Sequence, residues 1–311
     1  MGAFSHLLTD ANLDGHWSPV TASIDWCEIN YAVSFYIAEF LQINTLTNVP
    51  GMLGGLYGAY ATYNSGVPLR YALIYLGHAL ISIGSFGFHA SLRWEWQLMD
   101  ELPMIYVVSY ASYLVVDTLP GFEHRFGIAG PLAVVAWCIF VSVSYVCLPN
   151  PVYHQVAFAC IMLFSIVRAV WLSYQIPRER RTKICRTLLL GVGVFVMGFA
   201  VWNLDNFFCT HIREVRDWLT DHGLHHLGHL TQGHGYWHLM TSYGALLIFT
   251  ACVELCLSVK TNPYAYDYDA SAWLPLVRPV KSKVKDEDYG NGTASSKVNG
   301  NGHINGAANG H

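Results

Sequence analysis

Residues 84–106, GSFGFHASLRWEWQLMDELPMIY, decide the fold, because one apolar run ends and the next begins there with ionisable side chains between them. Ser85 and His89 lie four residues apart, so they share one face of a helix. Farther along, HGYWH places His234 and His238 at the same spacing at the start of another apolar run. A lone ionisable group costs about 2.5–3.5 kcal/mol at the centre of a membrane helix, so these residues indicate a functional site within a membrane.

The composition is that of a membrane protein. Of the 311 residues, 53% are hydrophobic and only 12% are charged, whereas soluble domains carry about 25% charged residues. The eight cysteines form no CxxC pair, and most lie in apolar runs where they act as packing residues. We therefore expect an all-α polytopic membrane protein, with no nucleic-acid partner and no obligate protein partner.

Seven apolar runs predict a seven-transmembrane-helix bundle, because each is near the ~20 residues that a spanning helix needs. The most basic short loop, PRERRTKICR at 177–186, lies between the fifth and sixth runs and is predicted to face the cytosol. The N-terminus and the loop 210–233 are then lumenal, and the C-terminus is cytosolic. The runs cover residues 31–60, 69–90, 98–117, 126–147, 152–175, 186–209 and 235–259.

These runs divide the chain into three parts. Residues 1–30 form a lumenal N-terminal segment without the features of a cleavable signal peptide. Residues 31–260 form the seven-helix membrane domain. Residues 261–311 form a cytosolic tail, which is Gly/Asn-rich and expected to be disordered from about residue 289.

The predicted topology brings His89, His234 and His238 to the same lumenal level, with Asp100 at the start of the third span. Three imidazoles and a nearby carboxylate suit a catalytic zinc site, which needs three protein nitrogens, a water in the fourth position and an acid/base beside it. The same spacing also fits hydrogen-bonded histidines in a core. A serine at position 85 can likewise bond only to its own helix.

Other polar residues receive structural interpretations. His78 lies about 16 Å from His89 along one helix and is too far away to share a metal. Asp205 is either a hydrogen-bond node or a partner behind a histidine, and Arg168 can reach the interface with its long side chain. The pairs His222–His226 and His225–His229 fall in DHGLHHLGHL and are interpreted mainly as solvated.

A second polar cluster precedes the first apolar run. Asp25, Glu28 and Asn30 offer hard oxygen ligands of the kind that Ca²⁺ prefers. The alternative is a helix capped by Asp25, with acidic residues in its first turn facing the helix dipole. Glu39 weakens that alternative, because a carboxylate inside an apolar run needs a counter-charge.

Four segments together resemble the alkaline ceramidases, seven-helix intramembrane zinc amidases of the wider ceramidase/adiponectin-receptor-like superfamily. The resemblance covers about residues 16–255. Its last motif departs mildly, with Tyr236 where a tryptophan is common. The segments are DWCEINYAVSFYIAEF (25–40), GSFGFHASLRWEWQLMDELPMIY (84–106), FAVWNLDNFFC (199–209) and GHGYWHLMTSYG (233–244).

The resemblance implies two metals and a substrate. The zinc would be held by His89, His234 and His238, with Ser85 and Asp100 completing the site. The substrate would be a ceramide, dihydroceramide or phytoceramide, cleaved by a zinc-activated water to a sphingoid base and a fatty acid in the endoplasmic reticulum or Golgi. The implied ligands of a structural or regulatory Ca²⁺ are Asp25, Trp26 through its backbone carbonyl, Glu28, Asn30 and Glu39.

The chemistry of the residues agrees with amide hydrolysis. Asp100 would take the proton of the attacking water and pass it to the leaving amine, and Ser85 would orient the carbonyl or the water. The main alternative is a seven-helix receptor or lipid-binding protein with a structural zinc site. A transporter should show repeat symmetry or broken helices near the midplane, and the sequence shows neither.

Cys27 and Cys209 are predicted to form a disulfide. Cys27 precedes the first span and Cys209 ends the sixth, so both lie on the predicted lumenal side. That compartment is oxidising, unlike the cytosol where Cys185 is placed. The alternative is two free packing cysteines.

Overall fold

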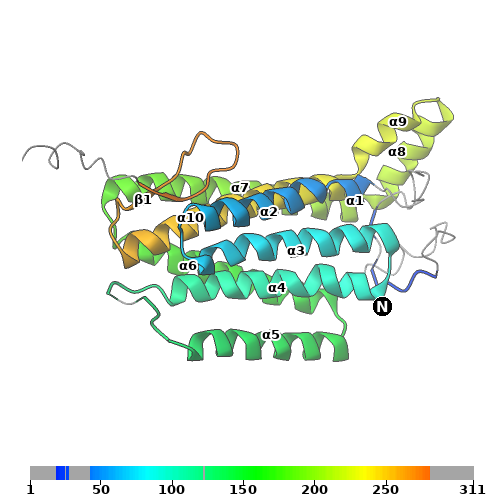
Figure 1. Cartoon of the computed structure of the whole chain (residues 1–311). Helices are drawn as coiled ribbons and strands as arrows, with labels where there is room; N and C mark the ends of the chain where they lie inside the picture. The colour runs from blue at the N-terminus through cyan, green and yellow to red at the C-terminus, as the bar shows by residue number, and fades with distance from the viewer. Residues whose placement is uncertain (1–18, 25, 28–42, 122, 281–311) are drawn as a thin grey trace, which may run out of the picture. The chain divides into compact units, whose positions relative to one another are not determined.

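The computed structural model describes residues 19–24, 26–27, 43–121 and 123–280, and this part of the chain is helical apart from two short paired strands (Figure 1). The strands are β1 (Tyr266–Asp267) and β2 (Arg278–Pro279). The α-helices are α1 (Ile43–Leu46), α2 (Val49–Asn64), α3 (Leu69–Ser91), α4 (Trp94–Val116), α5 (Ala129–Cys147), α6 (Pro151–Ser173), α7 (Arg178–Phe207), α8 (Cys209–Asp221), α9 (His225–Gly228) and α10 (Gly233–Lys260); a 3₁₀ turn, η1 (His229–Thr231), precedes α10.

Five helices among the described residues are long and apolar enough to cross a membrane: α3, α5, α6, α7 and α10. The all-α membrane class is thus confirmed, whereas the expected count of seven spans is not. Helix α4 has a spanning length but carries Glu95, Asp100 and Glu101. Helix α2 has 16 residues, and residues 28–42, where the first expected span begins, lie outside the described part.

Helix α10 is the centre of the bundle. It packs along α7 and also contacts α2, α3, α4 and α6. Glycines permit the close approach to α7: a Cβ on Gly191 would lie 2.8 Å from the Gly244 carbonyl oxygen, and one on Gly244 would lie 2.7 Å from that of Gly191. On the other side, a Cβ on Gly55 of α2 would lie 2.7 Å from the Ala79 nitrogen of α3. Small residues therefore bring these backbones together.

The expected loop at 177–186 is wrong, because these residues form the first turns of α7. Pro177 stands at the N-cap, and no glycine or proline follows it until residue 191. Arg180, Ile184 and Leu188 recur at helical spacing and are buried. Their burial extends the helix through a stretch whose charges alone indicate a loop.

The expected loop at 210–233 also needs correction, because α8 and α9 fill much of it. They extend beyond the end of α7 (Figure 1). Helix α8 buries Cys209 and Arg216, which lie seven residues apart on one face. The Arg216 guanidinium donates to the Cys27 carbonyl (3.1 Å) and to the Thr231 side chain (2.7 Å), so buried contacts hold the helix.

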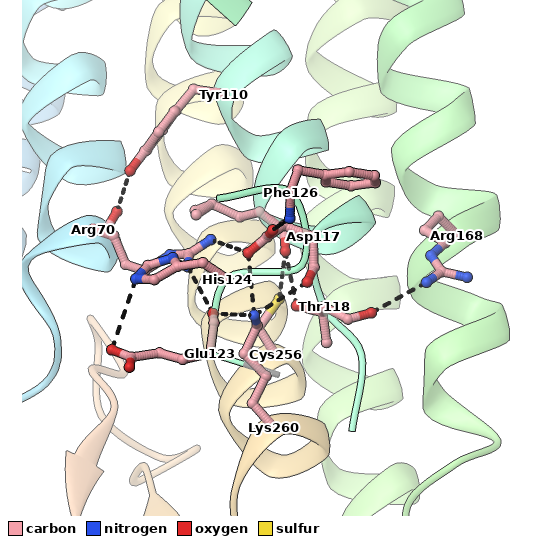
Figure 2. A network of polar contacts seen from close by, with 11 residues as sticks. Arg70, Tyr110, Asp117, Thr118, Glu123, His124, Phe126, Arg168, Cys256 and Lys260 are labelled. Carbon is pink, nitrogen blue, oxygen red and sulfur yellow. Dashed lines mark hydrogen bonds and ion pairs between the residues drawn. The ribbon is translucent and has the colours of Figure 1, made fainter. Parts of the chain in front are cut away.

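At the end of the bundle away from α8 and α9, Arg70 and Lys260 surround Asp117, which directly follows α4 (Figure 2). We call this end the basic end. The Asp117 carboxylate accepts from Arg70 of α3 (2.8 Å) and from Lys260 of α10 (3.1 Å). It also accepts from the Phe126 backbone N–H (3.2 Å). The Asp117 side chain is fully buried, and its partners place α3, α4 and α10 at one level.

Residues 261–280 fold back onto the bundle rather than leaving it. Tyr268 is buried and donates to the Thr187 hydroxyl of α7 (2.9 Å). Asp267 of β1 accepts from Lys183 (2.5 Å), and Arg180 forms an ion pair with the buried Glu254 of α10. The first turns of α7 thus bind this segment to α10.

Candidate metal centre

Three buried histidines meet where α3 ends and α10 begins. Nitrogen atoms of His89, His234 and His238 all lie within 4.8 Å of one another. Their ring centroids are 4.8, 4.8 and 4.5 Å apart, and the Nε2 atoms of His89 and His234 are separated by 3.2 Å. The structure therefore confirms that the three histidines converge and could hold a metal ion.

The turn between α1 and α2 contacts the Nδ1 atom of His238. This atom lies 3.0 Å from the Thr47 hydroxyl and 3.3 Å from the Asn48 amide. Thr47 donates its own proton to the Asn44 carbonyl (3.1 Å), so its oxygen accepts from Nδ1–H. We assign the ring proton to Nδ1 on this basis, which leaves the Nε2 lone pair for a ligand.

Three imidazoles are a donor set that zinc accepts, and one nitrogen pair already has the separation of a tetrahedral site. Zn–N bonds of about 2.0–2.1 Å at tetrahedral angles separate two ligand nitrogens by roughly 3.4 Å, close to the 3.2 Å between His89 and His234. Three neutral imidazoles leave a fourth position for water. The hydroxyl of Ser85 lies 3.4 Å from His238 Nε2, beside the same space.

Asp100 reaches this site because α3 and α4 cross very closely. A Cβ on Gly84 would lie only 1.8 Å from the Met99 carbonyl oxygen. That carbonyl has no helical N–H partner four residues on, because Pro103 occupies the position. The close crossing brings Asp100 against Ser85, whose hydroxyl donates to the carboxylate.

The segment before the first apolar run covers the site. The Trp26 ring stacks on His234 with centroids 5.0 Å apart, and it meets Trp202 edge-on at 5.3 Å. Directly after it, Cys27 is joined to Cys209 by a disulfide with Cα atoms 5.4 Å apart. An indole against one ligand ring limits solvent access to the site, and the cross-link holds the segment to the start of α8.

A cavity of about 310 Å³ opens beside the histidines. Its polar lining includes Ser85, Asp100, His234 and His238, and most of the remaining lining is apolar. Along α10 the lining residues extend from His234 to Cys252, roughly 27 Å at 1.5 Å per residue. The cavity suits an elongated apolar molecule with a polar group at one end.

Comparison with known proteins identifies the family. Residues 18–278 match the family model described as Ceramidase. The chain belongs to the ceramidase family. It is 33% identical over 281 residues to alkaline ceramidase YPC1 of Saccharomyces cerevisiae, covering 84% of this chain and 86% of that protein. It is 31% identical over 235 residues to alkaline ceramidase 3 of Mus musculus, covering 75% and 83%.

In this ceramidase-family protein, the side chain of Asp205 on α7 contacts the N-terminus of α10. Its Oδ1 accepts from the Gly233 backbone N–H (3.0 Å), directly before His234. A carboxylate at a helix N-terminus is favoured by the exposed N–H groups and the helix dipole. Asp205 therefore helps to fix the turn from which His234 and His238 project, which agrees with its interpretation as a hydrogen-bond node.

Other residues considered from the sequence fall outside the metal centre. Asp25, Glu28, Asn30 and Glu39 lie outside the described residues, so of the predicted calcium ligands only Trp26 is placed. His78 packs edge-on against Phe249 (5.8 Å). Arg168 donates to the Thr118 carbonyl (3.2 Å) at the basic end. The histidines 222, 225 and 226 are exposed, and 229 is half-buried.

Sequence reasoning missed Thr47, Asn48 and the ring of Trp26. Thr47 and Asn48 sit in INTLTNVP, within the run read as the first span. Polar residues in an apolar run require hydrogen-bond partners. The Thr–Asn pair in the sequence could therefore have indicated that these side chains contact another polar group. The stacking of Trp26 on His234 had no local signal, because it joins residues more than two hundred positions apart.

Proposed function

We propose that this chain is an intramembrane zinc-dependent amidase. It hydrolyses the amide of ceramides, including phyto- or dihydroceramide, to a sphingoid base and a free fatty acid. The observation that carries the proposal is the three-histidine cluster, with Asp100 and Ser85 beside it, at the polar end of a long apolar cavity. Membership of the ceramidase family and the alkaline ceramidases among its relatives support ceramide as the substrate class.

His89, His234 and His238 would hold the zinc. When bound, zinc lowers the pKa of a water ligand and polarises the substrate carbonyl. The apolar cavity binds the aliphatic chains and keeps bulk water away from the amide. The protein thereby orients the scissile bond at the histidine end of the bundle.

Asp100 and Ser85 handle the proton and the carbonyl. Asp100 accepts the proton of the attacking water and delivers it to the amide nitrogen, which leaves as the amine of the sphingoid base. The Ser85 hydroxyl lies between Asp100 and His238. Once Asp100 has taken the proton of the water, this hydroxyl is released from the carboxylate and donates to the carbonyl oxygen as negative charge develops there. Ser85 and Asp100 directly follow Gly84 and Met99, the two residues that touch where α3 and α4 cross. This one packing contact therefore positions both side chains.

The proposal includes the remaining parts of the predicted molecule. All seven runs span the bilayer of the endoplasmic reticulum or Golgi, with the N-terminus lumenal and the C-terminus cytosolic. Ca²⁺ bound by Asp25, the Trp26 carbonyl, Glu28, Asn30 and Glu39 holds the N-terminal segment over the zinc site. Added Ca²⁺ should raise the melting temperature of the wild type but not that of Glu39→Ala; an unchanged wild type contradicts the calcium site.

The test of the zinc site uses purified protein and a fluorescent ceramide. Replacing His89, His234 or His238 by Ala should abolish hydrolysis and lower bound zinc, because a three-ligand site cannot lose one imidazole and keep its geometry. Asp100→Asn should keep the zinc and lose hydrolysis. Metal content is measured by mass spectrometry, and His225→Ala is the control that keeps both.

Three results would contradict parts of the proposal. Full zinc occupancy in all three histidine variants rules out this metal site. Turnover by Asp100→Asn near the wild-type rate removes Asp100 as the base. Tight ceramide binding by the zinc-loaded wild type without any hydrolysis favours the receptor or lipid-binding alternative.

A further inference from the structure

A second carboxylate lines the same cavity and has no part in the proposed proton transfer. Glu101 follows Asp100 on α4, and its side chain is among the cavity-lining residues. Its Oε2 accepts from the Tyr145 hydroxyl of α5 (2.5 Å) and from the Gln97 amide one turn earlier on α4 (3.2 Å). None of the three histidines is among its hydrogen-bond partners in the described part of the chain.

The partners of Glu101 are themselves fixed. Gln97 is fully buried and bonds to the backbone N–H and hydroxyl of Ser23 (2.8 and 2.9 Å), in the segment that covers the metal centre. Tyr145 is 1% exposed. The carboxylate is thus held in one orientation before any substrate enters, which lowers the entropy cost of using it for recognition.

His154 of α6 completes a polar wall. Its Nε2 donates to the Glu101 carbonyl oxygen (2.7 Å), which leaves Nδ1 as an acceptor. His154 and its neighbour Gln155 both line the cavity. Together with Glu101 they supply hydrogen-bonding groups from two helices that carry none of the three histidines.

Within the described residues, only one oxygen of Glu101 is satisfied. Both donors bind Oε2, and no hydrogen bond to Oε1 occurs in this part of the chain. No Lys or Arg pairs with the carboxylate there either. In the part of the chain that the structure describes, Oε1 is thus left to accept from a hydroxyl or a water in the cavity.

We propose that Glu101 binds the primary hydroxyl of the sphingoid base and selects substrates that carry it. This inference rests on the proposed function. The hydroxyl-bearing carbons of such a base flank the carbon that carries the amide nitrogen. Asp100 and Glu101 both line the cavity, so with the amide at Asp100 a hydroxyl on a flanking carbon lies on the side of the cavity that also presents Glu101.

The direction of the cavity selects the primary hydroxyl over the secondary one. The apolar lining continues along α10 to Cys252, so the alkyl chain, which begins after the secondary hydroxyl, occupies that direction. The hydrogen bonds of Glu101 run in the opposite direction, through Gln97 to Ser23 in the segment that covers the metal centre. The primary hydroxyl is the free end of the base and belongs on that side.

The test compares ceramide with 1-deoxyceramide, which lacks only the primary hydroxyl. Wild-type kcat/KM should favour ceramide by about 10–100-fold, as expected when one partner of a buried hydrogen bond is missing. Glu101→Gln should bring the ratio near one through loss on ceramide alone. The matched control is Glu95→Gln on the same helix, where the side chain is 71% exposed and pairs with Arg93; it keeps the wild-type ratio.

A binding measurement separates this inference from the proposed function. Sphinganine should raise the melting temperature of the wild type more than 1-deoxysphinganine does, and Glu101→Gln should remove that difference. If the wild type hydrolyses neither amide, the proposed function is overturned and the thermal shifts alone decide the role of Glu101.

Several outcomes overturn the Glu101 assignment. They are equal wild-type activity on both amides, a wild-type ratio kept by Glu101→Gln, and an equal loss on both substrates, which would indicate a merely structural brace. If Glu101→Gln does not fold, Tyr145→Phe takes its place, because it removes one donor from Oε2. A folded Tyr145→Phe protein with an unchanged ratio overturns the assignment as well.

Discussion

At the scale of single residues, the metal centre depends on side chains that never touch the metal. The Thr47 hydroxyl holds His238 through Nδ1, and Trp26 stacks on His234. Such partners fix the tautomer and the ring plane of a ligand, so the lone pair is directed before the ion arrives. The affinity of the site therefore depends on the α1–α2 turn as well as on α3 and α10.

Thr47→Val should weaken zinc binding by about 10–100-fold, because valine keeps the shape of threonine but cannot accept the Nδ1 proton of His238. Competition with a chromophoric chelator measures the affinity, and hydrolysis should recover in excess zinc. Thr47→Ser retains the hydroxyl and should bind as the wild type does. Equal affinities for the valine and serine variants would show that the Thr47 hydroxyl does not orient the ring.

At the scale of helices, the crossing of α3 and α4 decides where Ser85 and Asp100, the proposed catalytic groups, meet. Gly84 lies against the Met99 carbonyl, and a Cβ on Gly87 would lie 2.1 Å from the Trp96 ring. A Cβ at position 84 would require the α4 backbone to move, and one at position 87 would require the Trp96 ring to shift. The helix that carries Asp100 is thus placed by two glycines of α3.

Gly84→Ala should sharply lower the melting temperature and abolish activity, because its Cβ would overlap a backbone carbonyl that has no room to move. Gly193→Ala is the matched control, since a Cβ on this glycine of α7 meets nothing within 4 Å. The control should be neutral or stabilising by up to about 1 kcal/mol. A Gly84→Ala protein with wild-type stability and turnover would contradict the packing argument.

At the scale of the whole bundle, Asp117 ties α3, α4 and α10 together at the end opposite the histidines (Figure 2). Burial would raise the pKa of Asp117, but hydrogen bonds from Arg70 and Lys260 outweigh it and hold the pKa below its ordinary value of 3.8. A lowered pKa means that the ionised form stabilises the fold above the unfolded-state pKa. This stabilisation is lost as the pH falls below about 3.8 through the folded-state pKa.

Asp117→Asn should cost about 3–5 kcal/mol at neutral pH, because two buried cations lose their counter-charge. The melting temperatures of the wild type and the variant should converge as the pH is lowered below 3.8. Thermal unfolding in detergent from pH 7 to pH 3 measures both effects. Glu123→Gln, whose side chain is 90% exposed, should follow the wild type, and a constant gap for Asp117→Asn at all pH values would contradict the electrostatic origin.

The link between Cys27 and Cys209 also acts on the whole molecule, because 182 positions separate the two residues. Non-reducing peptide mapping should recover the two cysteines in one cross-linked peptide. Cys209→Ser should lower stability by about 2–4 kcal/mol in the chain-entropy model. Cys185 is free and should react with an alkylating reagent after unfolding. A free thiol at Cys27 in native protein would refute both the bridge and the lumenal placement of the N-terminus.

The patterns that the sequence predicted well are local ones. Apolar runs indicated α3, α5, α6 and α10 to within a few residues, because burial in lipid acts on every residue of a span. The start of α7 was missed, because the charges of Arg180 and Lys183 resemble a loop until their partners Glu254 and Asp267 are seen. The helical segment α8 was missed because Arg216 is polar in sequence yet buried through contacts with Cys27 and Thr231.

The sequence by itself determined the membrane class and singled out His89, His234 and His238 as candidate metal ligands, because hydropathy and short motifs are properties of neighbouring residues. Only the tertiary structure decided that Thr47 orients His238 across 191 positions and that Glu101 is held by Tyr145 of another helix. Such partners depend on where glycine-packed helices cross. That crossing is set by the fit of whole helix faces, which no local pattern records.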